Sequence, residues 1–187
     1  KQTVMEIEGV EATSYVGILD LTNTESDLLY SIRIMGVELD NFSKVAYQES
    51  EYVKGGNIDT LLQKIDNSTE VIGQQDQVEL LSLGSNTTFV IKNWAVEGSD
   101  VVEKSYPVKF IDYFDYWPLL YTTAPSTTSK EIKIGMLANI TLPFTIARTE
   151  QNVEGKLFVK VQEGYSIDEV ANEIETTTRH TTVNVEE

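Results

Sequence analysis

The sequence predicts an all-β fold, a single β-sandwich that is Ig-like or jelly-roll-like, and two observations carry this prediction. Apolar and polar residues alternate with a period of two through most of the chain. Clusters of Gly, Asn, Asp and Ser separate these segments at short intervals, as turns between short strands do. The length of 187 residues and the 41% hydrophobic content are enough for one domain with a substantial core.

The expected strands are short and rich in β-branched residues, Thr among them, which suit a pleated surface. In chain order they lie at residues 13–22, 28–35, 44–49, 77–83, 87–94, 101–110, 132–141, 157–162 and 179–185.

Two segments have helical spacing instead. One short helix is expected at 57–65, where four apolar residues recur on one face. A second is expected at 166–175, where Ser166 and Glu169 form a capping box before an amphipathic run.

Residues 1–9 are expected to form a separate N-terminal strand, placed before a sandwich domain of residues 10–187. Apolar and polar residues alternate here until Gly9 ends the run. This strand could pair within its own subunit, or it could insert into the sheet of a neighbouring subunit as a donor strand. The candidate assembly residues are Thr3, Val4, Met5, Glu6 and Ile7.

Two features favour an extracellular protein at the cell surface. The chain begins at Lys1 and not at Met, which is typical of a product cut from a precursor. Four Asn-x-Ser/Thr sequons are candidate acceptors of N-linked glycans. They are Asn41, Asn67, Asn86 and Asn139.

The net charge of −16 argues against nucleic acid as a partner, because Lys and Arg must neutralise phosphates. The same charge argues against docking on an anionic membrane. No stretch approaches the roughly 20 apolar residues of a membrane-spanning helix, so no membrane insertion is expected.

No residue set in the sequence announces a reaction. Zero Cys and one His exclude thiol catalysis and make a soft-metal site implausible. We therefore expect no enzyme and no cofactor. Calcium is a weak alternative, because carboxylates that could act as hard oxygen ligands cluster on expected loops. The two clusters are Asp20, Glu25 and Asp27, and Glu97 and Asp100.

The densest aromatic segment spans residues 106–121. Its Tyr113, Tyr116 and Trp117 are candidates for a subunit interface or for stacking on sugar rings. Asp112 and Asp115 could serve as the carboxylate pair of a glycoside hydrolase, which is the weakest alternative.

These observations predict a secreted structural subunit of a homopolymeric surface filament, pilus-like and assembled by strand complementation between neighbouring subunits. Its partners would be copies of itself, with glycans as further partners. A virion structural protein, such as a capsid, decoration or tail-tube subunit, is one alternative. A carbohydrate-binding module is the other.

Overall fold

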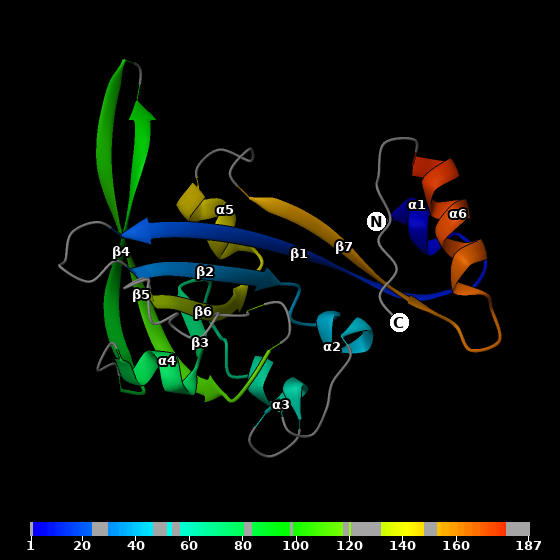
Figure 1. Cartoon of the computed structure of the whole chain (residues 1–187), viewed down its shortest axis with the longest axis horizontal. Helices are drawn as coiled ribbons and strands as arrows, with labels where there is room; N and C mark the ends of the chain where they lie inside the picture. Colours follow the sequence, from blue (N-terminus) through cyan, green and yellow to red (C-terminus); the bar gives the residue numbers. More distant parts are fainter. Residues whose placement is uncertain are drawn as a thin grey trace.

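The computed structural model describes residues 2–23, 30–46, 52–53, 57–80, 84–97, 99–117, 120, 132–147 and 153–178. Seven strands form one mixed sheet in the order β4-β5-β3-β6-β2-β1-β7 (Figure 1). The strands are β1 (Val10–Asn23), β2 (Tyr30–Val37), β3 (Glu70–Gln74), β4 (Thr87–Glu97), β5 (Asp100–Phe114), β6 (Ile132–Asn139) and β7 (Glu154–Val161). The helices are α1 (Gln2–Met5), α2 (Phe42–Val45), α3 (Ile58–Leu62), α4 (Gln75–Leu80), α5 (Thr141–Ala147) and α6 (Ile167–Thr178).

The predicted all-β sandwich is therefore wrong, because one mixed sheet with helices replaces two packed sheets. The pairs β2–β6 and β3–β5 are parallel, and the other neighbouring strands are antiparallel. Parallel strands are typically covered on both faces and read as continuous apolar runs. In β6, both Met136 and Leu137 are fully buried although they point to opposite faces.

Helices cover both faces of this sheet. On one face, α2 and α3 bury Phe42, Ile58 and Leu62 in a first hydrophobic core. On the other face, α4 and α5 bury Val78 and Ile146 in a second core. The result is a three-layer α/β arrangement with the sheet in the middle.

A row of small residues crosses the sheet beneath α5. Gly155, Gly17 and Gly36 lie opposite one another on β7, β1 and β2, and Ala138 continues the row on β6. The missing side chains at Gly17 and Gly36 leave the space that Phe144 and Pro143 of α5 occupy. The helix can therefore pack directly on the strand backbones.

A third, smaller core lies where β1 and β7 extend beyond the rest of the sheet. There α1 and α6 pack on each other and bury Val4, Ile7, Val170 and Ile174 (Figure 1).

The N-terminal donor strand predicted for Thr3–Ile7 is wrong, because its first part is the helix α1. The buried residues Val4 and Ile7 are three apart, which fits a helix turn, whereas Thr3 and Met5 are exposed. The segment's apolar residues pack against α6 and the end of β1, so they are already used within the chain.

Most expected strands are present, and two are wrong. Residues 77–83 were expected as a strand, but Gln77 to Leu80 belong to α4, which the Gln75–Glu79 side-chain hydrogen bond of 3.0 Å supports at the i,i+4 spacing. Residues 44 and 45 of the strand expected at 44–49 end helix α2. The strand expected at 179–185 lies outside the described residues.

Both expected helices are confirmed by their caps. The side chain of Asn57 accepts hydrogen bonds from the amides of Asp59 and Thr60 at the start of α3. The hydroxyl of Ser166 accepts one from the amide of Glu169 at 3.4 Å at the start of α6.

Candidate protein-interaction site

The outer part of the β4–β5 hairpin stands away from the sheet. The two strands pair along their whole length, from Thr87 opposite Phe110 to Glu97 opposite Asp100. In contrast, β3 pairs only with residues 109–114 of β5. Residues 90–97 and 100–107, which we call the arm, are therefore two-stranded and project beyond the sheet (Figure 1).

One face of the arm is apolar and exposed. Residues opposite each other in an antiparallel pair share a face, as do residues two apart in one strand. The register therefore places Val90, Trp94 and Val101 on one side, together with Pro107, which lies opposite Val90. Their exposed fractions are 55% for Val90, 64% for Trp94 and 65% for Val101. We call this side the Trp94 face.

The opposite face of the hairpin holds it to the domain. Ile91 and Val108 are buried in the second hydrophobic core. Asn93 lies on the same side, and its Nδ2 donates a hydrogen bond to the carbonyl of Ile146 in α5 at 3.0 Å. Because these neighbours of Trp94 point toward the domain, the Trp94 face points away from it.

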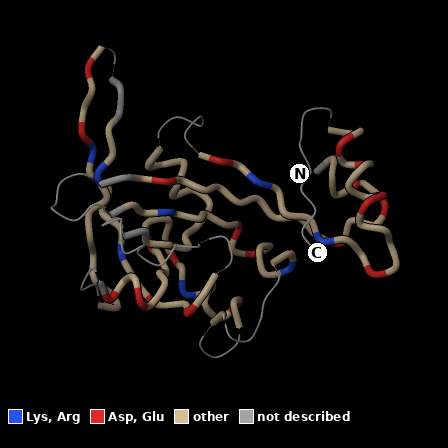
Figure 2. The backbone as a smooth tube through the Cα atoms, in the orientation of Figure 1, with Lys and Arg blue, Asp and Glu red and all other residues tan. Residues whose placement is uncertain are grey.

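The charges on the arm nearly cancel. The ammonium of Lys92 and the carboxylate of Glu103 form an ion pair of 3.2 Å on the Trp94 face itself. Glu97 and Asp100 form the last residue pair, so the end of the arm is acidic. Figure 2 shows that acidic residues are also numerous on α6, at the other end of the molecule.

The aromatic residues predicted as an interface or sugar platform lie elsewhere. Trp117 is only 2% exposed, with its ring centroid 5.6 Å from that of Phe42 in the first core. Its burial leaves no ring face for a sugar, so its predicted stacking role is wrong.

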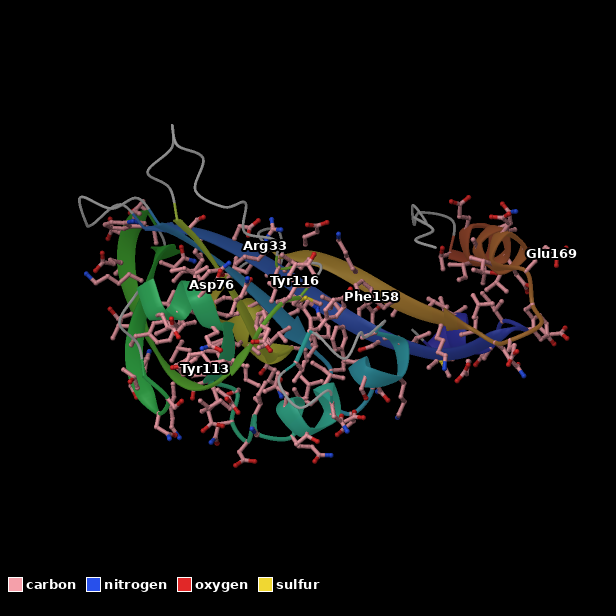
Figure 3. The ribbon with its side chains drawn as sticks, turned by 60° about the horizontal axis from the view of Figure 1, so that its bottom comes forward. Arg33, Asp76, Tyr113, Tyr116, Phe158 and Glu169 are labelled. Carbon is pink, nitrogen blue, oxygen red and sulfur yellow. The ribbon has the colours of Figure 1, made fainter. Side chains whose placement is uncertain are left out.

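The two tyrosines of the same prediction, labelled in Figure 3, are half-buried. Tyr116 packs on Tyr52 at a centroid distance of 5.2 Å, and Tyr113 meets the ring of Phe110 edge-on at 4.8 Å. Asp112, weighed as a hydrolytic carboxylate, is ion-paired with Lys64. The structure therefore does not gather these side chains into one exposed platform.

The four sequon asparagines differ in their surroundings. Asn67 and Asn86 are exposed on turns, and Asn86 has a positive φ of 65°. Asn139 and Asn41 are half-buried. Oδ1 of Asn139 accepts hydrogen bonds from the amide and hydroxyl of Thr141, both at 3.0 Å. Glycosylation of these residues stays a prediction, and the geometry favours Asn67 and Asn86.

Of the two clusters considered for calcium, Glu97 and Asp100 are paired at the end of the arm, whereas Asp20 of the first cluster is already used in another contact. Asp20 makes a bidentate ion pair with Arg33 at 2.7 and 2.8 Å, and this hydrogen-bonded pairing raises the pKa of Arg33. Glu25 and Asp27 lie outside the described residues. Within the part of the chain that the structure describes, no group of three or more His, Asp or Glu residues could hold a metal ion.

Sequence reasoning missed the arm, although its signal was present. The strand at 87–94 was expected, and the alternation along it, which the register confirms, puts Trp94 and Val90 on the side opposite Ile91. In the predicted β-sandwich, one side of this strand would face the second sheet, so that prediction did not suggest an exposed apolar side. The sequence places apolar residues on both faces of this hairpin, and one of the two faces contains Trp94. This pattern was the available sign of a second contact surface.

No family model matches this sequence, and no curated protein does. Solved structures align with this chain over most of its length. The extracellular domain of the noncanonic ABC-type transporter YknZ from Gram-positive bacteria aligns at a TM-score of 0.52, with 95% of this chain and 81% of that chain covered at 11% identity. The periplasmic region of MacB from Actinobacillus actinomycetemcomitans aligns at a TM-score of 0.43 and 7% identity. This alignment covers 94% of this chain and 71% of that chain.

These findings overturn the predicted pilus-like filament with donor-strand complementation. The predicted donor segment begins as helix α1, and the virion and carbohydrate-binding alternatives also rested on an all-β fold that the chain does not have. Among the described helices, none has the length and apolar character needed to cross a membrane. The chain is similar in fold to the extracellular domain of YknZ, and at 11% identity the likeness extends to the fold alone.

Proposed function

We propose that this chain is an extracytoplasmic domain of a membrane assembly of the ABC-transporter type, and that it acts by binding another protein and not by catalysis. The observation that carries the proposal is the fold likeness to the extracellular domain of YknZ, which spans 95% of this chain. A likeness over nearly the whole chain supports the role of a domain better than a match to one motif would.

The exposed arm supports a binding role. Large apolar side chains gathered on a projecting element typically mark a contact with another molecule. Trp is among the residue types that contribute most to such contacts. Trp94 lies on the arm opposite Glu103, three residue pairs from its end, and is 64% exposed, so a partner can reach it without displacing the domain's own core.

Cysteine labelling in cells of the source organism tests the location. Because this sequence has no Cys, one introduced Cys is the only thiol within these 187 residues that a maleimide can modify. Ser99→Cys places this thiol at an exposed position at the end of the hairpin. We expect a membrane-impermeant maleimide to label it in whole cells, after the outer membrane has been opened where there is one.

Ser14→Cys is the matched control, because Ser14 is fully buried and Cys has nearly the same size. It should react only after the protein has been denatured, which shows that labelling reports accessibility in the folded domain. If Ser99→Cys reacted only after the cytoplasmic membrane had been broken, the proposed location would be wrong.

A further inference from the structure

We propose that the Trp94 face of the arm seats in an apolar groove of a second protein, and that the rim of this groove is basic. The proposal rests on the proposed function, since the partner would be a protein that meets this domain outside the cytoplasm. It adds the contact surface, the central side chain and the chemistry of the partner.

The apolar surface is concentrated on the arm. Among the described residues, nine large hydrophobic side chains are exposed, and four of them belong to this one hairpin. They are Val90, Trp94 and Val101 on the Trp94 face, and Val102, opposite Ala95, on the other face. Single exposed apolar residues are normal, but a cluster centred on Trp has the composition of the centre of a protein interface.

The fold itself does not need the Trp94 face. Ile91 and Val108 hold the hairpin to the second core, and Asn93 holds it to α5, all from the opposite side. A two-stranded hairpin has little stability of its own in water. A partner on the Trp94 face would pack against the arm and remove the exposed indole from water.

The charges select the kind of partner. On the Trp94 face, Lys92 and Glu103 neutralise each other, so the apolar contact carries no net charge of its own. Around it, the last pair of the arm is Glu97 and Asp100, and the whole chain has a net charge of −16. A basic rim is complementary to this distribution and would also steer the encounter.

Two other occupants fit less well. A second copy of this chain also carries a net charge of −16, so the two copies would repel each other. An anionic bilayer would be repelled in the same way. End-on insertion of the arm in any bilayer would carry Glu97 and Asp100 in first, at a large desolvation cost.

A photoreactive amino acid at position 94, introduced in the source organism, finds the partner. The matched control is the same amino acid at Ile167, which is exposed but lies at the far end of the molecule on α6. We expect position 94, and not position 167, to give an adduct with one other protein, which mass spectrometry of the adduct identifies. An adduct with the mass of two copies of this chain would overturn the proposal.

The purified pair then tests the chemistry. We expect Trp94→Ala to weaken the affinity at least ~10-fold and Ile167→Ala to leave it within ~2-fold. We also expect the affinity to fall as the salt concentration rises from about 0.05 to about 0.3 M, because salt screens opposite charges. An affinity that is independent of salt, or unchanged by Trp94→Ala, would overturn the proposal.

Vesicles of phosphatidylcholine alone, and of phosphatidylcholine with phosphatidylglycerol, test the lipid alternative. Trp94-dependent binding to either would overturn the proposal in favour of a membrane. The failures of the two proposals are distinguishable. If Ser99→Cys is labelled outside the cytoplasm but the association does not depend on Trp94, the further inference fails and the proposed function stands. If Ser99→Cys is labelled only inside the cytoplasm, the proposed function itself fails.

Discussion

Gly36 of β2 lies directly beneath Pro143 of α5, so closely that a Cβ on Gly36 would be 2.6 Å from Cγ of the proline ring. Real Cβ atoms essentially never come this close to another heavy atom, and a proline ring in a helix cannot rotate away. The bare strand backbone at Gly36 is therefore what lets α5 pack on the sheet, and α5 in turn accepts the hydrogen bond from the arm at Asn93.

Gly36→Ala should destabilise the domain, because the added methyl group must push α5 off the sheet. Overpacking of this kind costs about 1–3 kcal/mol in the free energy of unfolding. Urea unfolding followed by circular dichroism measures it. The matched control is Gly155→Ala in the same row, where an added Cβ meets no atom within 4 Å and should cost little or nothing. Equal losses in both variants would contradict this account of the glycine row.

Substitution of the two tryptophans should affect the free energy of unfolding very differently. Trp117→Ala removes a ring packed on Phe42 in the first core, and we expect a loss of about 3–5 kcal/mol. Trp94→Ala removes an exposed ring and should change the free energy of unfolding by no more than about 0.5 kcal/mol. A large loss on Trp94→Ala would mean that the Trp94 face serves the fold.

Fluorescence gives a second, independent view of the same pair. Trp117→Phe leaves Trp94 as the only indole, whose emission should be that of a water-exposed tryptophan. Adding the purified partner should shift this emission to shorter wavelength, because the indole leaves water. The Trp94→Phe variant, whose remaining indole is already buried, should show no such shift.

Glu70 should make the stability of the domain depend on pH. Burial raises the pKa of Glu70, but hydrogen bonds from the amide of Asp66, the ammonium of Lys109 and the amide of Asn67 together hold this pKa below its ordinary value. A carboxylate with a lowered pKa stabilises the folded state above its unfolded pKa, which is about 4.3 for Glu. This stabilisation is lost as the pH falls through the folded-state pKa.

Glu70→Gln should therefore lower the free energy of unfolding at about pH 7 by roughly 1–2 kcal/mol. The difference from the native chain should shrink as the pH falls below the unfolded pKa, and it should vanish once Glu70 is neutral in the folded state as well. Urea unfolding at several pH values measures this convergence. Glu163→Gln, at an exposed position, serves as the control and should follow the native chain at every pH. If the difference in the free energy of unfolding stayed constant down to low pH, the charge on Glu70 would not contribute to stability.

Asn93 should determine how firmly the arm is held. Asn93→Ala removes the hydrogen bond to the carbonyl of Ile146, and this carbonyl then loses its partner from the arm. We expect the amides of the arm to exchange hydrogen faster in this variant, while those of β6 stay protected. Exchange measured by mass spectrometry checks it, and unchanged exchange in the arm would mean that Ile91 and Val108 hold the hairpin without Asn93.

The sequence allowed most strands to be located, because local alternation follows from the pleat of a strand wherever it lies. It did not reveal how the strands are covered. The alternation seen in β1 and β5 is compatible with a sandwich, whereas adjacent residues of β6 are buried on opposite faces. Leu137, for example, departs from the alternation because helices cover both faces of its strand.

Short helices were hard to predict for a related reason. In α1 and α4 a run of four to six residues fits a period of two nearly as well as a period of 3.6. The tertiary contact decides between them, as it does for Val78 of α4, which packs against the bare backbone of Gly73. The arm could be located as two strands, but its projection depends on the short length of β3, which local sequence does not reveal.

Hydrogen exchange of this chain in native membranes, compared with the isolated domain, tests the central claim most directly. If the Trp94 face seats in a partner, the amides of residues 90–97 and 100–107 should exchange more slowly in the membranes than in the isolated domain. Those of α6, at the other end of the molecule, should exchange alike in both. Identical exchange of the arm in the two preparations would contradict the proposal that the arm is the contact surface.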